Sequence, residues 1–116
     1  LVSRRARKTG WHIFITNSPG VSQADPMVNF SLNADCGKAW FGWPCDPELE
    51  RLRDAFARAS DEPERRATAE QVQVRAMEIG THVPLGEYVL PTAARKNVTG
   101  LLPGPQTMVL WNVGKR

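Results

Sequence analysis

Apolar side chains recur at helical spacing through residues 46–80, where the pattern predicts a helical hairpin. Its first helix begins at Asp46-Pro47, because aspartate caps helix N-termini and proline is favoured at the first helical position. The apolar face of this helix has residues three and four apart: Leu49, Leu52 and Phe56, with Ala55 and Ala59 beside them.

The second helix of the hairpin has its own start and stop signals. Asp61 and Glu64 form the D-x-x-E pattern of a capping box, and Gly80 closes the helix. Its apolar face is expected at Ala69, Val72, Ala76 and Ile79.

The segments before the hairpin are shorter and less regular. A polar helix or arm is expected before Gly10, and alternating β-forming residues predict a strand at 11–16. Asp25-Pro26 repeats the helix-start signal, so a short helix is expected from Pro26 to Leu32.

The segments after the hairpin are apolar and extended. Pro84 argues against a central strand position for residues 82–90. Two short β-type runs follow at 97–102 and 107–113, separated by Pro-Gly-Pro. The expected order β-α-α-α-β-β makes the chain mixed α/β, and these terminal strands need partners that the chain itself is not expected to contain.

Composition and charge limit the class of protein. A chain of 116 residues with 41% apolar residues fits one small domain or a piece of a larger one. No apolar run approaches the ~20 residues of a membrane span. The chain starts without Met or a signal-peptide pattern, so an excised fragment is expected, with any targeting segment removed.

The net charge of +3 comes from the chain ends. Without the terminal bases, nine bases stand against twelve acids, which disfavours nucleic-acid binding by the body of the chain. These terminal bases are Arg4, Arg5, Arg7, Lys8, Lys115 and Arg116. A stand-alone interaction module that uses the basic N-terminal arm on nucleic acid or protein remains the alternative reading.

The only two cysteines, Cys36 and Cys45, enclose an aromatic loop. A zinc site would need both of them with His12 and His82, and neither pair has zinc-ligand spacing. A disulfide is the other possibility, and it requires an oxidising compartment. It would hold rigid aromatic side chains that either line a cleft or form local core: Trp40, Phe41 and Trp43.

The sequence offers no catalytic motif. His12 and His82 each stand at the entrance to an extended run, without a nucleophile or an orienting acid in a recognisable pattern. We therefore expect no enzymatic activity, no cofactor and no metal; a small hydrolase that uses either histidine is a rival without support.

Taken in order, these segments resemble the C-terminal part of the bacterial extracytoplasmic solute-binding proteins that feed peptide and nickel ABC importers (family 5). The similarity covers about residues 10–113. The matching stretches are GWHIF (10–14), DPMVNF (25–30), DPELERL (46–52), DEPERR (61–66), THVPLGEY (81–88), ARKNVTG (94–100) and WNV (111–113).

The resemblance implies a fold. It places the chain in the C-terminal part of a two-lobed, type II periplasmic-binding-protein-like α/β fold, with a strand, the helical hairpin and short terminal strands. Residues 1–90 would belong to the second lobe, and residues 91–116 would cross back and add strands to the first. The isolated piece is then expected to self-associate through its strand edges. The resemblance also implies a periplasmic location and a Cys36–Cys45 disulfide.

The resemblance also implies a function. The protein would be the substrate-binding component of an ABC importer, with a peptide or other small solute and the permease subunits of the inner membrane as partners, and no nucleic acid. The cleft-facing loop would contain Asn17, Ser18, Val21, Ser22 and Gln23. Peptide-binding members place an aspartate for the ligand ammonium where this chain has Ser22, which puts ordinary peptide binding through that contact in doubt.

Overall fold

The computed structural model describes residues 2–102, 104 and 109–116. The chain divides into two compact units, Leu1–Val83 and Pro84–Arg116. The predicted lobe boundary at 90/91 concerns a larger protein and stays a prediction, as does the two-lobed architecture.

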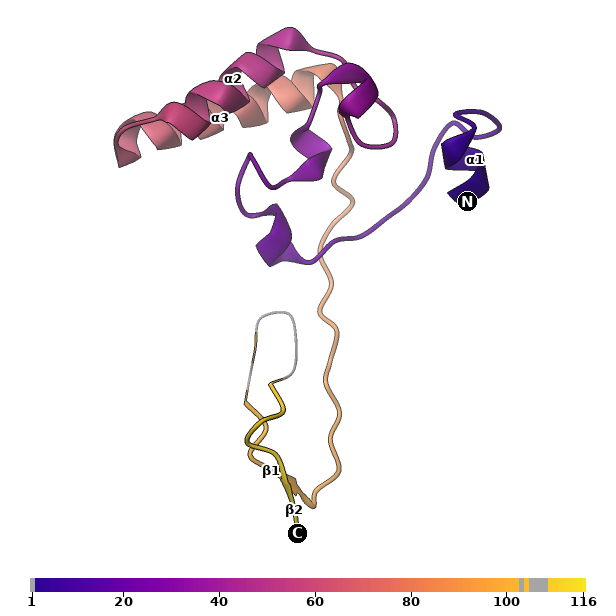
Figure 1. Ribbon diagram of the computed structural model, residues 1–116, viewed down its shortest axis with the longest axis vertical. Helices are drawn as coiled ribbons and strands as arrows, with labels where there is room; N and C mark the ends of the chain where they lie inside the picture. Colours follow the sequence, from indigo (N-terminus) through magenta and orange to yellow (C-terminus); the bar gives the residue numbers. More distant parts are fainter. Residues whose placement is uncertain (1, 103, 105–108) are drawn as a thin grey trace. The chain divides into compact units, whose positions relative to one another are not determined.

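The predicted helical hairpin is confirmed. Helices α2 (Pro47–Arg58) and α3 (Glu62–Ile79) lie side by side in the first unit (Figure 1). Asp46 caps α2 by accepting from the Leu49 amide at 2.7 Å. Asp61 caps α3 by accepting from the Glu64 amide at 2.8 Å, and Gly80 ends α3 in the left-handed conformation at φ 66°.

The core of the first unit lies between this hairpin and the loop that precedes it. Leu49 and Val72 are fully buried on the facing sides of α2 and α3. The cluster also contains Ala34, Leu52 and Ala76, with Leu32 and Ile79 packed against it. Phe56 is buried as well, so the apolar stripe expected on α2 is the one that the core uses.

The segments before α2 form single turns. Helix α1 (Val2–Ala6) is followed by three 3-10 turns: η1 (Gly20–Gln23), η2 (Phe30–Leu32) and η3 (Cys36–Lys38). The predicted strand at 11–16 is wrong. This segment is extended, but no strand pairs with it in the described part of the chain, and Ile13 and Ile15 are exposed.

The predicted helix from Pro26 to Leu32 is also wrong in extent. Asp25 caps a single turn, accepting from the Met27 amide at 2.7 Å. Asn29 then adopts an extended conformation and caps η2 with its own side chain, which accepts from the Ser31 amide at 3.0 Å. Because the Asn29 side chain competes for backbone amide donors, the helix does not continue beyond one turn.

The second unit contains a short antiparallel ladder. Strands β1 (Val98–Thr99) and β2 (Gly114–Lys115) pair with Val98 opposite Lys115, and a further bridge joins Leu102 to Val109. The expectation that the terminal strands lack a partner within the chain is therefore wrong, because they pair with each other. The second strand begins at Gly114, after the run predicted at 107–113, of which Thr107 and Met108 lie outside the described residues.

Residues 82–90 are extended, as predicted, and the extended backbone continues to residue 95; it pairs with no strand among the residues described. None of the described helices is long and apolar enough to cross a membrane.

Candidate functional site

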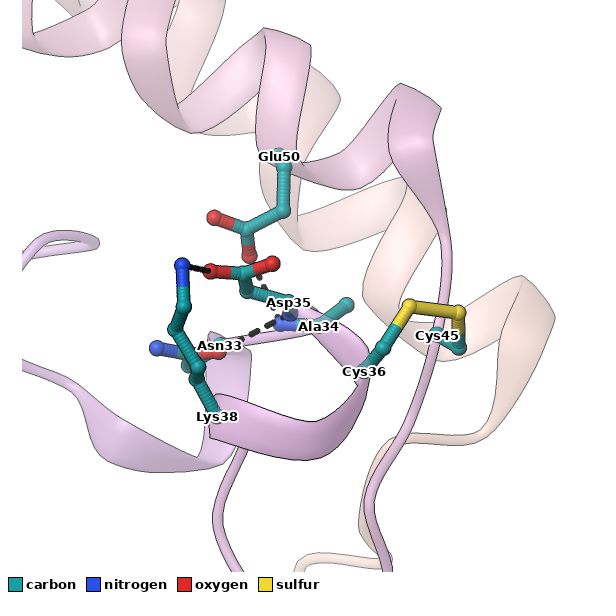
Figure 2. The surroundings of a disulfide bond; sticks show 7 residues. All are labelled: Asn33, Ala34, Asp35, Cys36, Lys38, Cys45 and Glu50. Atoms are coloured by element: carbon teal, nitrogen blue, oxygen red, sulfur yellow. Dashed lines mark hydrogen bonds and ion pairs between the residues drawn. A yellow bond between two sulfur atoms is a disulfide. The ribbon is translucent and has the colours of Figure 1, made fainter.

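A disulfide joins Cys36 and Cys45 and closes the aromatic loop (Figure 2). The loop is also closed by the backbone, because Asp35 and Cys45 form an antiparallel bridge and the Cys36 amide donates to the Pro44 carbonyl at 3.0 Å. The Asp46 amide donates to the Ala34 carbonyl at 3.1 Å, which fixes the base of the loop to the start of α2. The predicted disulfide is thus present in the structure.

The loop aromatics pack against aromatic side chains from earlier in the chain. We call this set the aromatic cluster: Trp11, Phe14, Phe30, Trp40, Phe41 and Trp43. Its closest pair is Phe30 and Trp40, whose ring centroids lie 4.3 Å apart. The three candidate wall residues are half-buried and contact one another, so they form local core; a ligand-facing role for them stays a prediction.

Trp40 links the two ends of residues 15–29, the segment that contains the candidate cleft loop (residues 17–23). Phe14 precedes this segment and Phe30 follows it, and their ring centroids lie 5.3 and 4.3 Å from that of Trp40. The disulfide loop therefore brings together the two ends of residues 15–29, although they are far apart in sequence.

Two cations of the basic arm lie over the aromatic cluster. The Arg5 guanidinium lies 4.1 Å from the centroid of Phe41, and the Lys8 ammonium lies 4.5 Å from that of Trp43. Such contacts attract a cation to the ring face. Because rings of the aromatic cluster already engage these two cations, the geometry does not favour the alternative of an arm held out for nucleic acid.

The candidate cleft residues lie on one loop that ends in η1. Ser22 donates from its hydroxyl to the Pro19 carbonyl at 2.8 Å, and Gln23 donates from its side chain to the Ser22 carbonyl at 3.2 Å. Val21 is 55% exposed, Asn17 is exposed and Ser18 is half-buried. The structure thus gathers Val21, Ser22 and Gln23 in one turn.

Asp25, three residues after Ser22, is the nearest acid in the sequence to the position where peptide-binding members have an aspartate. Its carboxylate accepts from the Met27 amide, and its carbonyl accepts from the Asn29 amide at 2.9 Å. The side chain therefore has a structural role at this turn, as its helix-start signal predicts.

Sequence reasoning missed Arg53 and its partner Glu50. Arg53 is only 5% exposed, and it pairs with Glu50 at 2.6 Å. A signal was present, since Arg53 follows Leu49 by four residues and precedes Phe56 by three, which puts a charge on the apolar stripe of α2.

A second ion pair joins the two helices at the start of α2. The Arg75 guanidinium donates to both carboxylate oxygens of Asp46, at 3.1 and 2.6 Å. This hydrogen-bonded pairing lowers the pKa of Asp46 below its ordinary value, and the amide of Leu49 lowers it further. The same contact raises the pKa of Arg75.

The two histidines do not lie in a common site with other potential metal ligands among the described residues. His12 is exposed, while the Nδ1 atom of His82 lies 2.9 Å from the Thr81 hydroxyl. Within residues 2–102, 104 and 109–116, no three side chains of the metal-ligating types gather to hold an ion. A hollow over the exposed side of the hairpin is lined by Glu48, Leu52, Glu70, Val74, Arg75 and Glu78, none of them a predicted site residue.

Comparison with known proteins yields a relative that is itself a binding protein. The chain is 36% identical over 120 residues to the probable peptide ABC transporter periplasmic-binding protein y4tO of Sinorhizobium fredii (strain NBRC 101917 / NGR234). The match covers 99% of this chain and 22% of that relative, so the chain spans about a fifth of its length. No family model matches the chain, and no solved structure does. The similarity supports a relationship between this chain and the periplasmic solute-binding proteins of ABC transporters.

Proposed function

We propose that the chain is the C-terminal part of the substrate-binding component of a bacterial ABC importer, of the peptide- and nickel-binding type (family 5). The observation that carries this proposal is the 36% identity over 99% of the chain to a probable peptide-transporter binding protein. The protein binds and hands over a solute and performs no chemistry on it. A two-lobed binding protein of this kind encloses its solute between lobes and presents the closed form to the permease subunits of the inner membrane.

The proposed location is the periplasm. The Cys36–Cys45 disulfide supports it, because disulfides persist in oxidising compartments such as the bacterial periplasm. The name of the similar protein points the same way.

The proposed ligand is a peptide or a related small solute, and it meets the loop of residues 17–23. Ser22 offers a neutral hydroxyl where an ammonium group would need a carboxylate, since a buried cation without a charged partner is costly. The Asp25 carboxylate accepts a hydrogen bond from the Met27 amide and so caps the turn. We therefore propose that the solute does not present a free terminal ammonium at this contact, as in a modified peptide or an opine-like compound.

The test uses the longer protein that this proposal implies, purified from the periplasm of its host. Native mass spectrometry should show a co-purified small solute, lost after unfolding and refolding. Titration of the emptied protein with trialanine, carrying a free ammonium, against N-acetyl-trialanine should favour the acetylated peptide.

A matched variant sharpens this test. Ser22→Asp should reverse the preference toward trialanine, because it restores a carboxylate at the contact, while Ser31→Asp, placed after the candidate loop, should leave it unchanged. A protein that retains no solute, binds neither peptide and binds nucleic acid with steep salt dependence would instead support the interaction-module alternative.

A further inference from the structure

We infer that the ion pair of buried Arg53 and half-buried Glu50 positions two segments against α2: the turn after the cleft loop and the base of the disulfide loop. The importance of this ion pair for ligand binding rests on the proposed function. The positioning itself rests on the contacts of the two side chains.

Arg53 holds the turn that follows the cleft loop. Its Nε atom donates to the Pro26 carbonyl at 3.1 Å, and its Nη2 atom donates to the Met27 carbonyl at 3.3 Å. Its Nη1 atom donates to both carboxylate oxygens of Glu50, at 2.6 and 2.7 Å. The three guanidinium nitrogens thus have partners from two separate parts of the chain.

Glu50 holds the base of the disulfide loop. Its Oε1 atom accepts from the Ala34 amide at 2.6 Å, and Ala34 is 1% exposed. Figure 2 shows the Glu50 side chain reaching from α2 to the backbone of Ala34, two residues before Cys36. A single ion pair therefore connects turn 25–29, the base of the disulfide loop and α2.

The shape of the guanidinium group explains why position 53 needs arginine. Its planar fork presents donors in fixed directions, so Glu50 and the two carbonyls are satisfied in one geometry. A lysine ammonium is a compact charge without this fork. Because the Arg53 side chain is buried, the pair also loses part of its Coulombic gain to desolvation, so its main contribution is to fix geometry.

The cleft loop depends on this geometry at its far end. The Asn29 side chain donates to the Gln23 carbonyl at 3.4 Å, which links the turn that Arg53 holds to the end of η1. Movement of the turn would therefore move Ser22 and Gln23 relative to the aromatic cluster.

The test is hydrogen exchange, followed by mass spectrometry, on the full 116-residue chain and on Arg53→Lys. Exchange in peptides covering 25–29 should accelerate roughly tenfold or more, as expected for lost hydrogen bonds to a charged group. Peptides from α3 should change little, and the Ala34 amide should stay protected because Glu50 is retained. The matched control is Arg51→Lys, the same change on the same helix, where the native arginine is exposed and pairs with Glu48.

A second pair of variants keeps the inference falsifiable if Arg53→Lys proves too mild. Glu50→Gln retains an acceptor for Ala34, whereas Glu50→Ala removes it, so only the alanine variant should also release the 34–36 segment. Equal acceleration in α3 and in both loops would show general destabilisation and overturn the inference, as would unchanged exchange at 25–29 in Arg53→Lys and Glu50→Ala alike.

Ligand titration separates this inference from the proposed function. In the longer protein, Arg53→Lys should weaken N-acetyl-trialanine binding severalfold more than Arg51→Lys, measured at a temperature where circular dichroism shows both variants fully folded. If the parent protein binds no peptide, the proposed ligand class fails, while the exchange pattern still decides whether the pair positions the loops.

Discussion

Asp46 combines two contacts that usually belong to different residues. Its carboxylate caps α2 through the Leu49 amide and also accepts both donors of Arg75 from α3. One side chain therefore fixes both the start of a helix and the packing of that helix on its neighbour.

The lowered pKa of Asp46 predicts how stability depends on pH. A carboxyl whose pKa is lower in the folded state contributes stability above its ordinary value of 3.8. That contribution should be lost as the pH falls from about this value through the lowered folded pKa. Urea unfolding at a series of pH values should show a smaller loss of stability in acid for Asp46→Asn than for the parent chain.

The matched control for this prediction is Asp54→Asn. Asp54 is exposed and pairs with Arg58 four residues along the same helix. It should lower stability less at neutral pH, since exposed pairs contribute little. An acid profile for Asp46→Asn that parallels the parent chain would contradict the prediction.

At this scale, the sequence predicts contacts made within a few residues and misses those made across the chain. Asp25, Asp46 and Asp61 all cap turns or helices as expected, because a cap joins a side chain to an amide two or three residues away. Arg53 donates to carbonyls 27 and 26 residues earlier, and no local rule specifies that pairing.

At the scale of elements, the α2–α3 hairpin should show stability concentrated on one face. Val72 is fully buried and Val74 is 58% exposed, and both stand on α3. Val72→Ala should lower the free energy of unfolding by about 2 kcal/mol through lost burial and a small cavity. Val74→Ala should change it by no more than about 0.5 kcal/mol, and it controls for the difference in helix propensity. Equal effects in urea unfolding would contradict the packing described.

The disulfide loop gives a second prediction at this scale. Replacing Cys36 and Cys45 together by serine should lower stability by about 2–3 kcal/mol on the loop-closure model. The tryptophan emission of the folded state should shift as well, because Trp40 and Trp43 lie within the loop. Adding a reductant should reproduce both changes in the parent chain and neither in the double variant.

An element can be predicted from the sequence where a single segment contains both its packing partner and the residues that start and end it. The hairpin between 46 and 80 has both, with caps at Asp46 and Asp61 and a stop at Gly80. Residues 11–16 have strand-forming side chains, yet a strand also needs a neighbour in register, which lies beyond what local alternation specifies. The aromatic cluster could not be predicted from the sequence either, because its six rings come from three separate stretches of the chain.

At the scale of the whole molecule, apolar surface is left uncovered on extended backbone. Val83, Leu85, Val89 and Leu90 are 75–89% exposed within residues 82–95, which pair with no strand in the described part of the chain. In the proposed function, polypeptide from the rest of the binding protein covers this segment. In the isolated chain the same edge is a template for strand addition.

We therefore expect the isolated chain to self-associate, in a manner that one charge on this edge suppresses. Sedimentation velocity over a concentration series should show oligomers for the parent chain and a larger monomer fraction for Val89→Lys, because lysine on an edge strand disfavours pairing. Val74→Lys adds the same charge at an exposed valine whose backbone is already paired within α3, so it should leave association nearly unchanged. If both lysine variants suppress association equally, net charge is the cause; if the parent chain is monomeric throughout, residues 82–95 are covered in some other way and the expected edge pairing is wrong.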